Sequence, residues 1–145
     1  EILHQAKEKG VNLLLPVDHI VADAFSAEAQ TKEIEGEIEA GWMALDIGPK
    51  TAALYSEAVA TAKTVVWNGP MGCFEMAPFA NGTNSVCAAV AASDSVSIIG
   101  GGDSVAAVKA AGVADQMSQV STGGGASLEF MEGKQLPGIV ALTDA

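Results

Sequence analysis

Two glycine triplets constrain the fold of this chain more than any other feature of its sequence. Gly100–Gly102 and Gly123–Gly125 each follow a short apolar or β-branched run, Ser95–Ile99 and Gln119–Ser121, and each precedes a helix-like segment. Glycine loses more backbone entropy on folding than any other residue. Two triplets at strand ends therefore favour a backbone that must approach a ligand. The alternative is that both are simply tight strand-to-helix turns.

Strand-like and helix-like segments alternate along the chain, which is typical of βαβ units and a parallel sheet. The predicted strands are Asn12–Leu15, Ile20–Ala22, Met43–Ile47, Thr64–Trp67, Ser95–Ile99 and Gln119–Ser121. The predicted helices are Lys50–Ala62, Asn81–Ala92, Asp103–Gly112 and Ala126–Glu132. The Glu-rich stretch 28–40 is predicted to be a solvated, partly irregular connection, and Leu136–Leu142 a final extended segment.

This order of elements predicts an α/β fold, a Rossmann-like three-layer arrangement in which a parallel sheet carries helices on both faces. Right-handed crossovers place the carboxyl ends of all the strands on one edge of such a sheet. Ligands of open α/β sheets bind at that edge, where helix N-termini offer free N–H groups. Both glycine triplets are expected there.

Composition excludes several classes of function. Hydrophobic residues make up 49% of the 145 residues and charged residues 17%, so the chain can bury the core of about one domain. Seven lysines and no arginine stand against 18 acidic residues, for a net charge of −11. No basic surface is expected for a nucleic acid, and no arginine can clamp a phosphate in bidentate fashion. A phosphate site here must use backbone amides, a metal ion and lysine.

The ends and the cysteines add further expectations. No apolar run approaches the roughly 20 residues of a membrane helix, and Glu1–Gly10 has no apolar signal core. We therefore expect no membrane partner and a cytoplasmic location. The first residue is not Met, which suggests a piece of a longer protein. Cys73 and Cys87 lack CxxC spacing and are predicted to be reduced and packed, and His4 and His19 are predicted to be structural.

The motif Gly100-Gly101-Gly102-Asp103-Ser104 points most directly to chemistry. A glycine turn at a helix start supplies amides to an anion. Asp103 either stabilises the helix N-terminus or binds Mg²⁺, which on nucleotide phosphates is held by one or two carboxylates. Ser104 has a hydroxyl to donate to a phosphate oxygen.

Two further motifs follow strands. Ser121-Thr122-Gly123-Gly124-Gly125 has no adjacent acid, and such an uncharged amide cradle suits the developing charge of a transferring anionic group; it is otherwise an ordinary helix start. The segment Trp67–Glu75, WNGPMGCFE, has the composition of an apolar slot with one carboxylate, Glu75, that accepts from a ribose hydroxyl. Alone it is equally consistent with a packed loop.

Four motifs in this order resemble phosphoglycerate kinase. They are Leu45-Asp46-Ile47-Gly48-Pro49, Trp67–Glu75, Gly100–Ser104 and Ser121–Glu129. The resemblance covers essentially the whole chain and is to the later part of the family's nucleotide-binding C-terminal domain. It implies a glycolytic transferase that moves a phosphoryl group reversibly between 1,3-bisphosphoglycerate and ADP, giving 3-phosphoglycerate and ATP, with Mg²⁺ as cofactor.

The resemblance also implies roles for individual residues. Asp103 holds the metal–nucleotide, and its neighbours Gly101, Gly102 and Ser104 face the phosphates. The catalytic contribution comes from the glycines that face the transferring phosphoryl group, which are Gly123, Gly124 and Gly125. Ser104 replaces the commoner Thr and keeps the hydroxyl.

The nucleoside is assigned to a second group of residues by the same resemblance. Glu75 holds the ribose, and Leu45 borders adenine. The residues that line the nucleotide site within the second motif are Asn68, Gly69 and Pro70. Two further positions depart from the family pattern: Ala44 stands where Gly is usual and adds a methyl group near the adenine slot, and Cys73 stands where an aliphatic residue is usual.

Members of the family contain parts that this chain lacks. Residues 1–145 are expected to be a partial nucleotide-binding C-terminal domain, without the N-terminal domain that binds phosphoglycerate and without the lysines that contact the nucleotide phosphates. We expect the chain to be inactive alone and the whole protein to be a monomer. The alternatives are a non-catalytic anion- or partner-binding α/β module and a purely structural domain in which the glycine triplets bind nothing.

Overall fold

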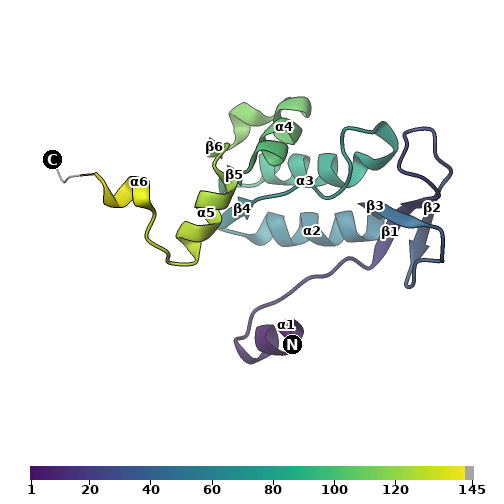
Figure 1. The fold of residues 1–145 in the computed structure, drawn as a ribbon, viewed down its shortest axis with the longest axis horizontal. Helices are drawn as coiled ribbons and strands as arrows, with labels where there is room; N and C mark the ends of the chain where they lie inside the picture. Colours follow the sequence, from purple (N-terminus) through teal and green to yellow (C-terminus); the bar gives the residue numbers. More distant parts are fainter. Residues whose placement is uncertain (143–145) are drawn as a thin grey trace.

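Two short sheets divide the strands between them in the computed structural model, which describes residues 1–142 (Figure 1). The strands are β1 (Asp18–Ala22), β2 (Thr31–Glu35), β3 (Met43–Ile47), β4 (Thr64–Trp67), β5 (Val96–Gly100) and β6 (Gln119–Ser121). The α-helices are α1 (Ile2–Glu8), α2 (Pro49–Thr61), α3 (Asn81–Ala92), α4 (Gly102–Ala110), α5 (Gly124–Met131) and α6 (Pro137–Val140). Two 3₁₀ turns, η1 (Ala77–Phe79) and η2 (Ala114–Gln116), complete the order.

The first sheet is antiparallel, with strand order β2-β1-β3. The prediction that residues 28–40 form a partly irregular connection was wrong, because they contain β2. In β2 only Lys32 and Ile34 are half-buried. A strand is recognised by alternating apolar and polar residues, and here Ile34 is the one apolar residue among glutamates, so the pattern is too weak to detect. The Lys32 ammonium group lies 4.1 Å from the centroid of the Trp42 ring, a cation–π contact that holds this edge strand.

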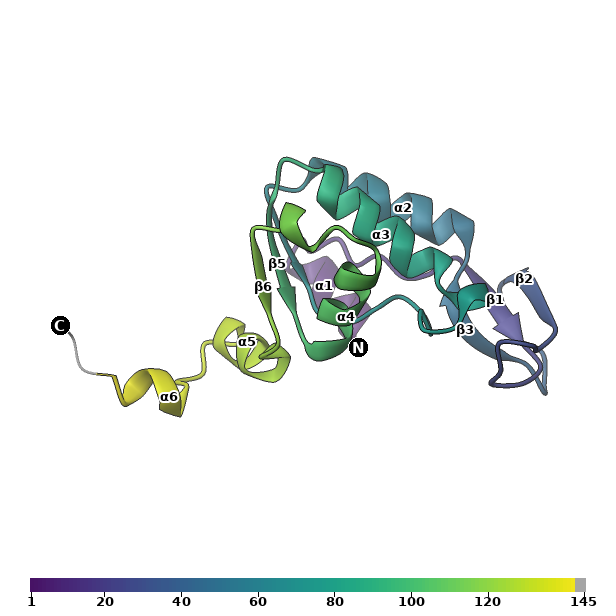
Figure 2. The same cartoon turned by 90° about the horizontal axis from the view of Figure 1, so that it is seen from above.

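The second sheet is parallel, with strand order β4-β5-β6, and confirms the predicted α/β class. Figure 2 shows α2 and α3 side by side along this part of the molecule, while α5 and α6 extend away from it. The core between the sheet and helices α3 and α4 consists of Trp67, Val86, Cys87, Val90, Ile99, Val105, Val108 and Met117. This core packs helices α3 and α4 against the parallel sheet and so fixes the positions of the strand ends that carry the glycines.

The other face of the parallel sheet is approached by α5. Side chains alternate along a strand, so Val66 and Ile98 face away from the core that holds Trp67 and Ile99. Together with Phe130 of α5 they line an apolar groove of about 320 Å³. Helix α5 covers this face only in part, since the Phe130 side chain is exposed.

Two predictions about the ends and connections were wrong, and one helix was missed. Asn12–Leu15 forms no strand, because no neighbouring strand pairs with it; it links α1 to β1 along the outside of the molecule (Figure 1). The final segment contains helix α6, which begins at Pro137, a residue whose fixed φ suits the first helical position. Helix α1 was not predicted. Within the described residues no helix is long and apolar enough to cross a membrane.

A buried carboxylate from β1 caps helix α2. Asp18 is fully buried and accepts the N–H groups of Lys50 and Thr51 at 2.8 Å each, as well as the Thr51 hydroxyl. A Cβ atom at Gly48 would collide with this carboxylate. Burial by itself would raise the pKa of Asp18, but these hydrogen bonds and the Lys50 charge together hold that pKa below its ordinary value.

A second carboxylate, from β3, caps helix α3. Asp46 is 3% exposed and accepts the N–H groups of Gly82 at 2.8 Å and Ile47 at 2.9 Å. A Cβ atom at Gly82 would collide with it. Here burial raises the pKa of the carboxyl, because two backbone N–H groups offset the lost solvation only in part.

Asp18→Asn should lower the free energy of unfolding at pH 7 by about 2 kcal/mol, since the amide presents N–H to a donor where the carboxylate accepts. A lowered folded-state pKa contributes stability that is present above the unfolded pKa, about 3.9, and is lost as pH falls through the folded value. The gap between wild type and variant should therefore narrow from pH 7 to pH 3 in urea titrations.

The comparison at each pH isolates Asp18, because Asp46, whose raised pKa gives the opposite slope, is present in both proteins. Asp94→Asn, at an exposed position, is the matched control and should change the free energy of unfolding by less than about 0.5 kcal/mol. A gap that stays constant across this pH range would contradict the assignment.

Candidate functional site

The two glycine triplets lie side by side at the carboxyl edge of the parallel sheet. The Gly101 N–H donates to the Ser121 carbonyl at 3.1 Å. A Cβ atom at Gly124 would come within 2.7 Å of the Gly101 Cα and of the Asn68 Oδ1. Residues from the ends of β4, β5 and β6 thus meet in one place, as the sequence predicts for a parallel sheet.

The Gly101 backbone has φ +91°, a conformation that favours glycine, and it forms the N-cap of α4. The first N–H groups of a helix have no partner within it, and at α4 these belong to Gly102, Asp103 and Ser104. At α5 the Gly123 and Gly124 N–H groups bond to the Ser121 hydroxyl and the Thr122 carbonyl. The open amides of α5 are therefore those that follow, from Gly125.

Asp103 and Ser104 are adjacent in α4 but have different surroundings. Asp103 is exposed in the first turn. Ser104 is 1% exposed, and its Oγ accepts the Gly69 N–H at 2.6 Å. The Ser104 hydroxyl thus bonds inward to the loop after β4, while Asp103 extends into solvent at the edge.

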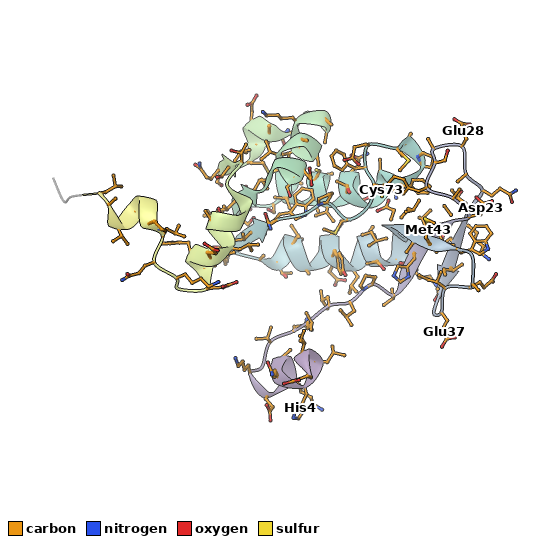
Figure 3. The ribbon with its side chains drawn as sticks, in the orientation of Figure 1. His4, Asp23, Glu28, Glu37, Met43 and Cys73 are labelled. Atoms are coloured by element: carbon orange, nitrogen blue, oxygen red, sulfur yellow. The ribbon has the colours of Figure 1, made fainter. Side chains whose placement is uncertain are left out.

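A cavity of about 290 Å³ lies between the antiparallel sheet and the loop after β4. It brings together Leu45, which the resemblance assigns to adenine, and the neighbouring departures from the family pattern, Ala44 and Cys73. The Cys73 N–H donates to the Leu45 carbonyl at 2.8 Å, which fixes one wall to another. Figure 3 shows Cys73 at the end of the molecule that holds Met43 and Asp23.

Burial, and next the negative charges of Glu75 and Asp46, raise the pKa of the Cys73 thiol. The thiol therefore stays protonated at neutral pH and acts as a small apolar wall rather than a nucleophile. Glu75 is exposed on the same loop, two residues further on. Asn68, Gly69 and Pro70 occupy its beginning, between this cavity and the glycine edge.

Two residues of this region, Asp46 and Thr83, were given no role from the sequence, and a third, His19, was expected to be structural only. Asp46 caps α3 beside the cavity, and Thr83, fully buried in the first turn of α3, accepts two N–H groups of the loop. A polar residue near the start of an Ala-rich helix was the available signal for Thr83. His19, expected to be structural, lines the cavity, and its buried Nδ1 has no partner in the described part of the chain.

The described residues contain no group of three or more His, Cys, Asp or Glu side chains that could hold a metal ion by themselves. A metal at the glycine edge would therefore be held by Asp103 together with ligand oxygens. This agrees with the way Mg²⁺ is bound on nucleotide phosphates, through one or two carboxylates and several waters.

The parallel sheet and its flanking helices define an α/β domain in which two helix N-termini lie open at the carboxyl edge, the place where open α/β sheets bind their ligands. The family model for phosphoglycerate kinase matches residues 1–134. The chain is 64% identical over 145 residues to a phosphoglycerate kinase of Acidobacterium capsulatum and 62% identical to one of Clostridium botulinum strain Langeland. The chain therefore belongs to the phosphoglycerate kinase family.

Solved structures agree with this assignment. Phosphoglycerate kinase from Coxiella burnetii is 47% identical and superposes with a TM-score of 0.89 over 95% of this chain. The enzyme from Pyrococcus horikoshii OT3 is 33% identical, with a TM-score of 0.77 over 97% of this chain. The chain spans 36% of the length of both curated relatives and of the Coxiella structure, and 38% of the Pyrococcus structure.

Gly124→Ala should lower the free energy of unfolding by about 1–3 kcal/mol, the range for overpacking, because its methyl group meets Gly101 and Asn68. Gly125→Ala, in the same triplet, places a methyl group where nothing lies within 4 Å. It should change stability by less than about 0.5 kcal/mol. Urea titration of the two variants measures the difference, and equal losses would show that the triplets do not touch in solution.

Proposed function

We propose that this chain supplies the nucleotide-binding part of a phosphoglycerate kinase of glycolysis, which transfers a phosphoryl group reversibly between 1,3-bisphosphoglycerate and ADP to give 3-phosphoglycerate and ATP. One observation carries the proposal: the Asn68 side chain and the two glycine triplets lie within contact distance at one edge, beside two open helix N-termini. Membership of the family supports the same reaction.

The phosphates of the nucleotide are assigned to the N-terminus of α4, through the N–H groups of Gly102, Asp103 and Ser104. The transferring phosphoryl group is assigned to the N-terminus of α5, where Gly123–Gly125 keep side chains out of the way. Amide dipoles aimed at a group whose charge spreads in the transition state stabilise it without reorganising. Gly101 contributes through its backbone conformation, which turns the chain into α4.

Asp103 fits a Mg²⁺ ion bound on the nucleotide phosphates, because its carboxylate is exposed beside the open amides of α4. When bound, the metal neutralises phosphate charge. Asp103 then orients the metal–nucleotide against the amides, and the glycines of both triplets leave the main chain free to approach it.

The base is assigned to the cavity lined by Ala44, Leu45 and Cys73, which is apolar on these sides. The Ala44 methyl group narrows the slot slightly. Glu75, exposed at the end of the loop, accepts from the ribose hydroxyls. Asn68, Gly69 and Pro70 span the distance between base and phosphates.

The composition fits a nucleotide site that relies on another part of a longer protein. With no arginine and a net charge of −11, the chain offers no basic surface for phosphoglycerate. We propose that a separate N-terminal domain binds phosphoglycerate, that residues 1–145 are inactive alone, and that the whole protein is a cytoplasmic monomer without a nucleic-acid or membrane partner.

Asp103→Asn should remove most of the gain in ADP affinity that Mg²⁺ gives. Loss of a metal ligand that contributes about 1.4 kcal/mol weakens binding roughly tenfold. Calorimetric titration of ADP with and without Mg²⁺ measures the effect, and Asp115→Asn, at an exposed position in η2, is the control. An equal loss with and without the metal would instead favour the non-catalytic anion-binding module.

Glu75→Gln should reduce the preference for ADP over 2′,3′-dideoxy-ADP, because the carboxylate accepts hydrogen bonds that the dideoxy sugar cannot donate. Charge-assisted hydrogen bonds contribute about 1.5–3 kcal/mol, so we expect a loss of roughly tenfold in the affinity ratio. Competition binding in Mg²⁺ measures that ratio. Glu28→Gln, also exposed, should leave it unchanged; an unchanged ratio in the Glu75 variant would remove Glu75 from the ribose site.

A further inference from the structure

We infer that Thr83 is a positioning residue for nucleotide binding, which acts by fixing the backbone of the loop at residues 69–73. This inference rests on the proposed function, because that loop carries the residues assigned between base and phosphates. The loop follows β4 and lies outside every helix and strand. Its conformation must therefore be set by contacts other than a regular hydrogen-bond ladder.

Every N–H group of the loop bonds inward. The Thr83 Oγ1 accepts the N–H groups of Met71 at 3.0 Å and Gly72 at 3.3 Å. The Gly69 N–H donates to the Ser104 Oγ, and the Cys73 N–H donates to the Leu45 carbonyl. Residue 70 is proline and has no N–H group. The loop can therefore offer side chains and carbonyls to a ligand, but none of its amides.

This pattern separates the loop from the glycine edge beside it. At α4 the first amides are open to an anion, whereas in the loop each amide is already bound to a protein oxygen. The sequence does not show this difference, because the loop also contains glycines, Gly69 and Gly72. The buried hydroxyls of Thr83 and Ser104 turn it into a fixed wall.

Thr83 lies in a helix turn that contacts two walls of the base cavity. It is fully buried in the first turn of α3, next to Gly82, whose N–H is held by Asp46. The same turn thus binds β3, which carries Leu45, and the loop, which carries Cys73. Removing the hydroxyl leaves two donors without an acceptor, and such groups are costly when buried. The loop is then expected to move relative to the base cavity while the sheet stays in place.

Amide hydrogen exchange tests the anchoring without any ligand. In the wild-type chain, Met71 and Gly72 should exchange slowly although they lie outside regular structure. Thr83→Val keeps the shape and removes the acceptor, and should speed exchange at both amides by about tenfold or more. Thr83→Ser keeps the acceptor and should restore protection to within about threefold of wild type, since rotamer freedom is its main cost.

The matched control is Thr61→Val, which removes a hydroxyl bonded to the Ala58 carbonyl at the far end of α2. It should leave Met71 and Gly72 unchanged. Equal exchange at these amides in wild type and Thr83→Val would overturn the inference. Should Thr83→Val fail to fold, the wild-type measurement decides, because fast exchange of the Met71 amide in the folded chain is incompatible with the anchoring.

Calorimetric binding of MgADP supplies the functional readout. Thr83→Val should weaken binding by about tenfold, Thr83→Ser should rescue it, and urea titration shows whether the variant remains folded at the temperature used. Accelerated exchange with unchanged MgADP affinity would show that the anchor has no positioning role. A wild-type chain that binds no MgADP would overturn the proposed function, and the link to nucleotide with it, while the exchange data still decide whether Thr83 fixes the loop.

Discussion

Both the packing of the fold and the candidate site depend on which acceptors bind the free N–H groups at the helix N-termini. Each α-helix begins with N–H groups that have no partner within the helix, and the positive end of the helix dipole adds to their attraction for anions. In α2 and α3 the partner is a buried carboxylate from a neighbouring strand, Asp18 or Asp46. These two contacts join the antiparallel sheet to the helices that pack against the parallel sheet. A buried cluster of Ala22, Leu45 and Phe79 also ties the antiparallel sheet to the segment that follows the loop after β4.

The four central helices therefore divide into two kinds. At the N-termini of α2 and α3 the anion is a carboxylate of the protein itself. The lack of a side chain at Gly48 and Gly82 leaves room for these carboxylates. Helices α4 and α5 also begin with glycines, but among residues 1–142 no carboxylate from a strand accepts a hydrogen bond from their first N–H groups, and both helices open at the carboxyl edge. A glycine-containing helix N-terminus thus binds a carboxylate of the protein itself in α2 and α3. In α4 and α5 the same kind of N-terminus leaves room for a ligand.

Much of this arrangement follows from the sequence. Alternating elements predict the parallel sheet, and a parallel sheet by its topology brings the ends of β5 and β6 together. The antiparallel sheet could not be predicted in the same way, because β2 has a single inward apolar residue, Ile34, among glutamates. The inward direction of the Ser104 hydroxyl could not be predicted either, because the Gly100–Ser104 motif does not indicate which side of the helix turn faces the core. Asp46 lies within the Leu45–Pro49 motif, but its role depends on Gly82, 36 residues away.

Under the proposed function, the charge at the glycine edge explains why an acid stands among the phosphate-binding amides. Asp103 lies in the first turn of α4, where a carboxylate stabilises the helix dipole but repels a bound phosphate. A chain with no arginine has no fixed guanidinium group to offset that repulsion. A divalent cation held by Asp103 on the nucleotide phosphates would turn this repulsion into attraction, so Asp103 would favour a metal-bound nucleotide over a free one. Asp103 then contributes selectivity for the metal-bound nucleotide, whereas the neutral amides of α5 stabilise the negative charge of the transferring phosphoryl group.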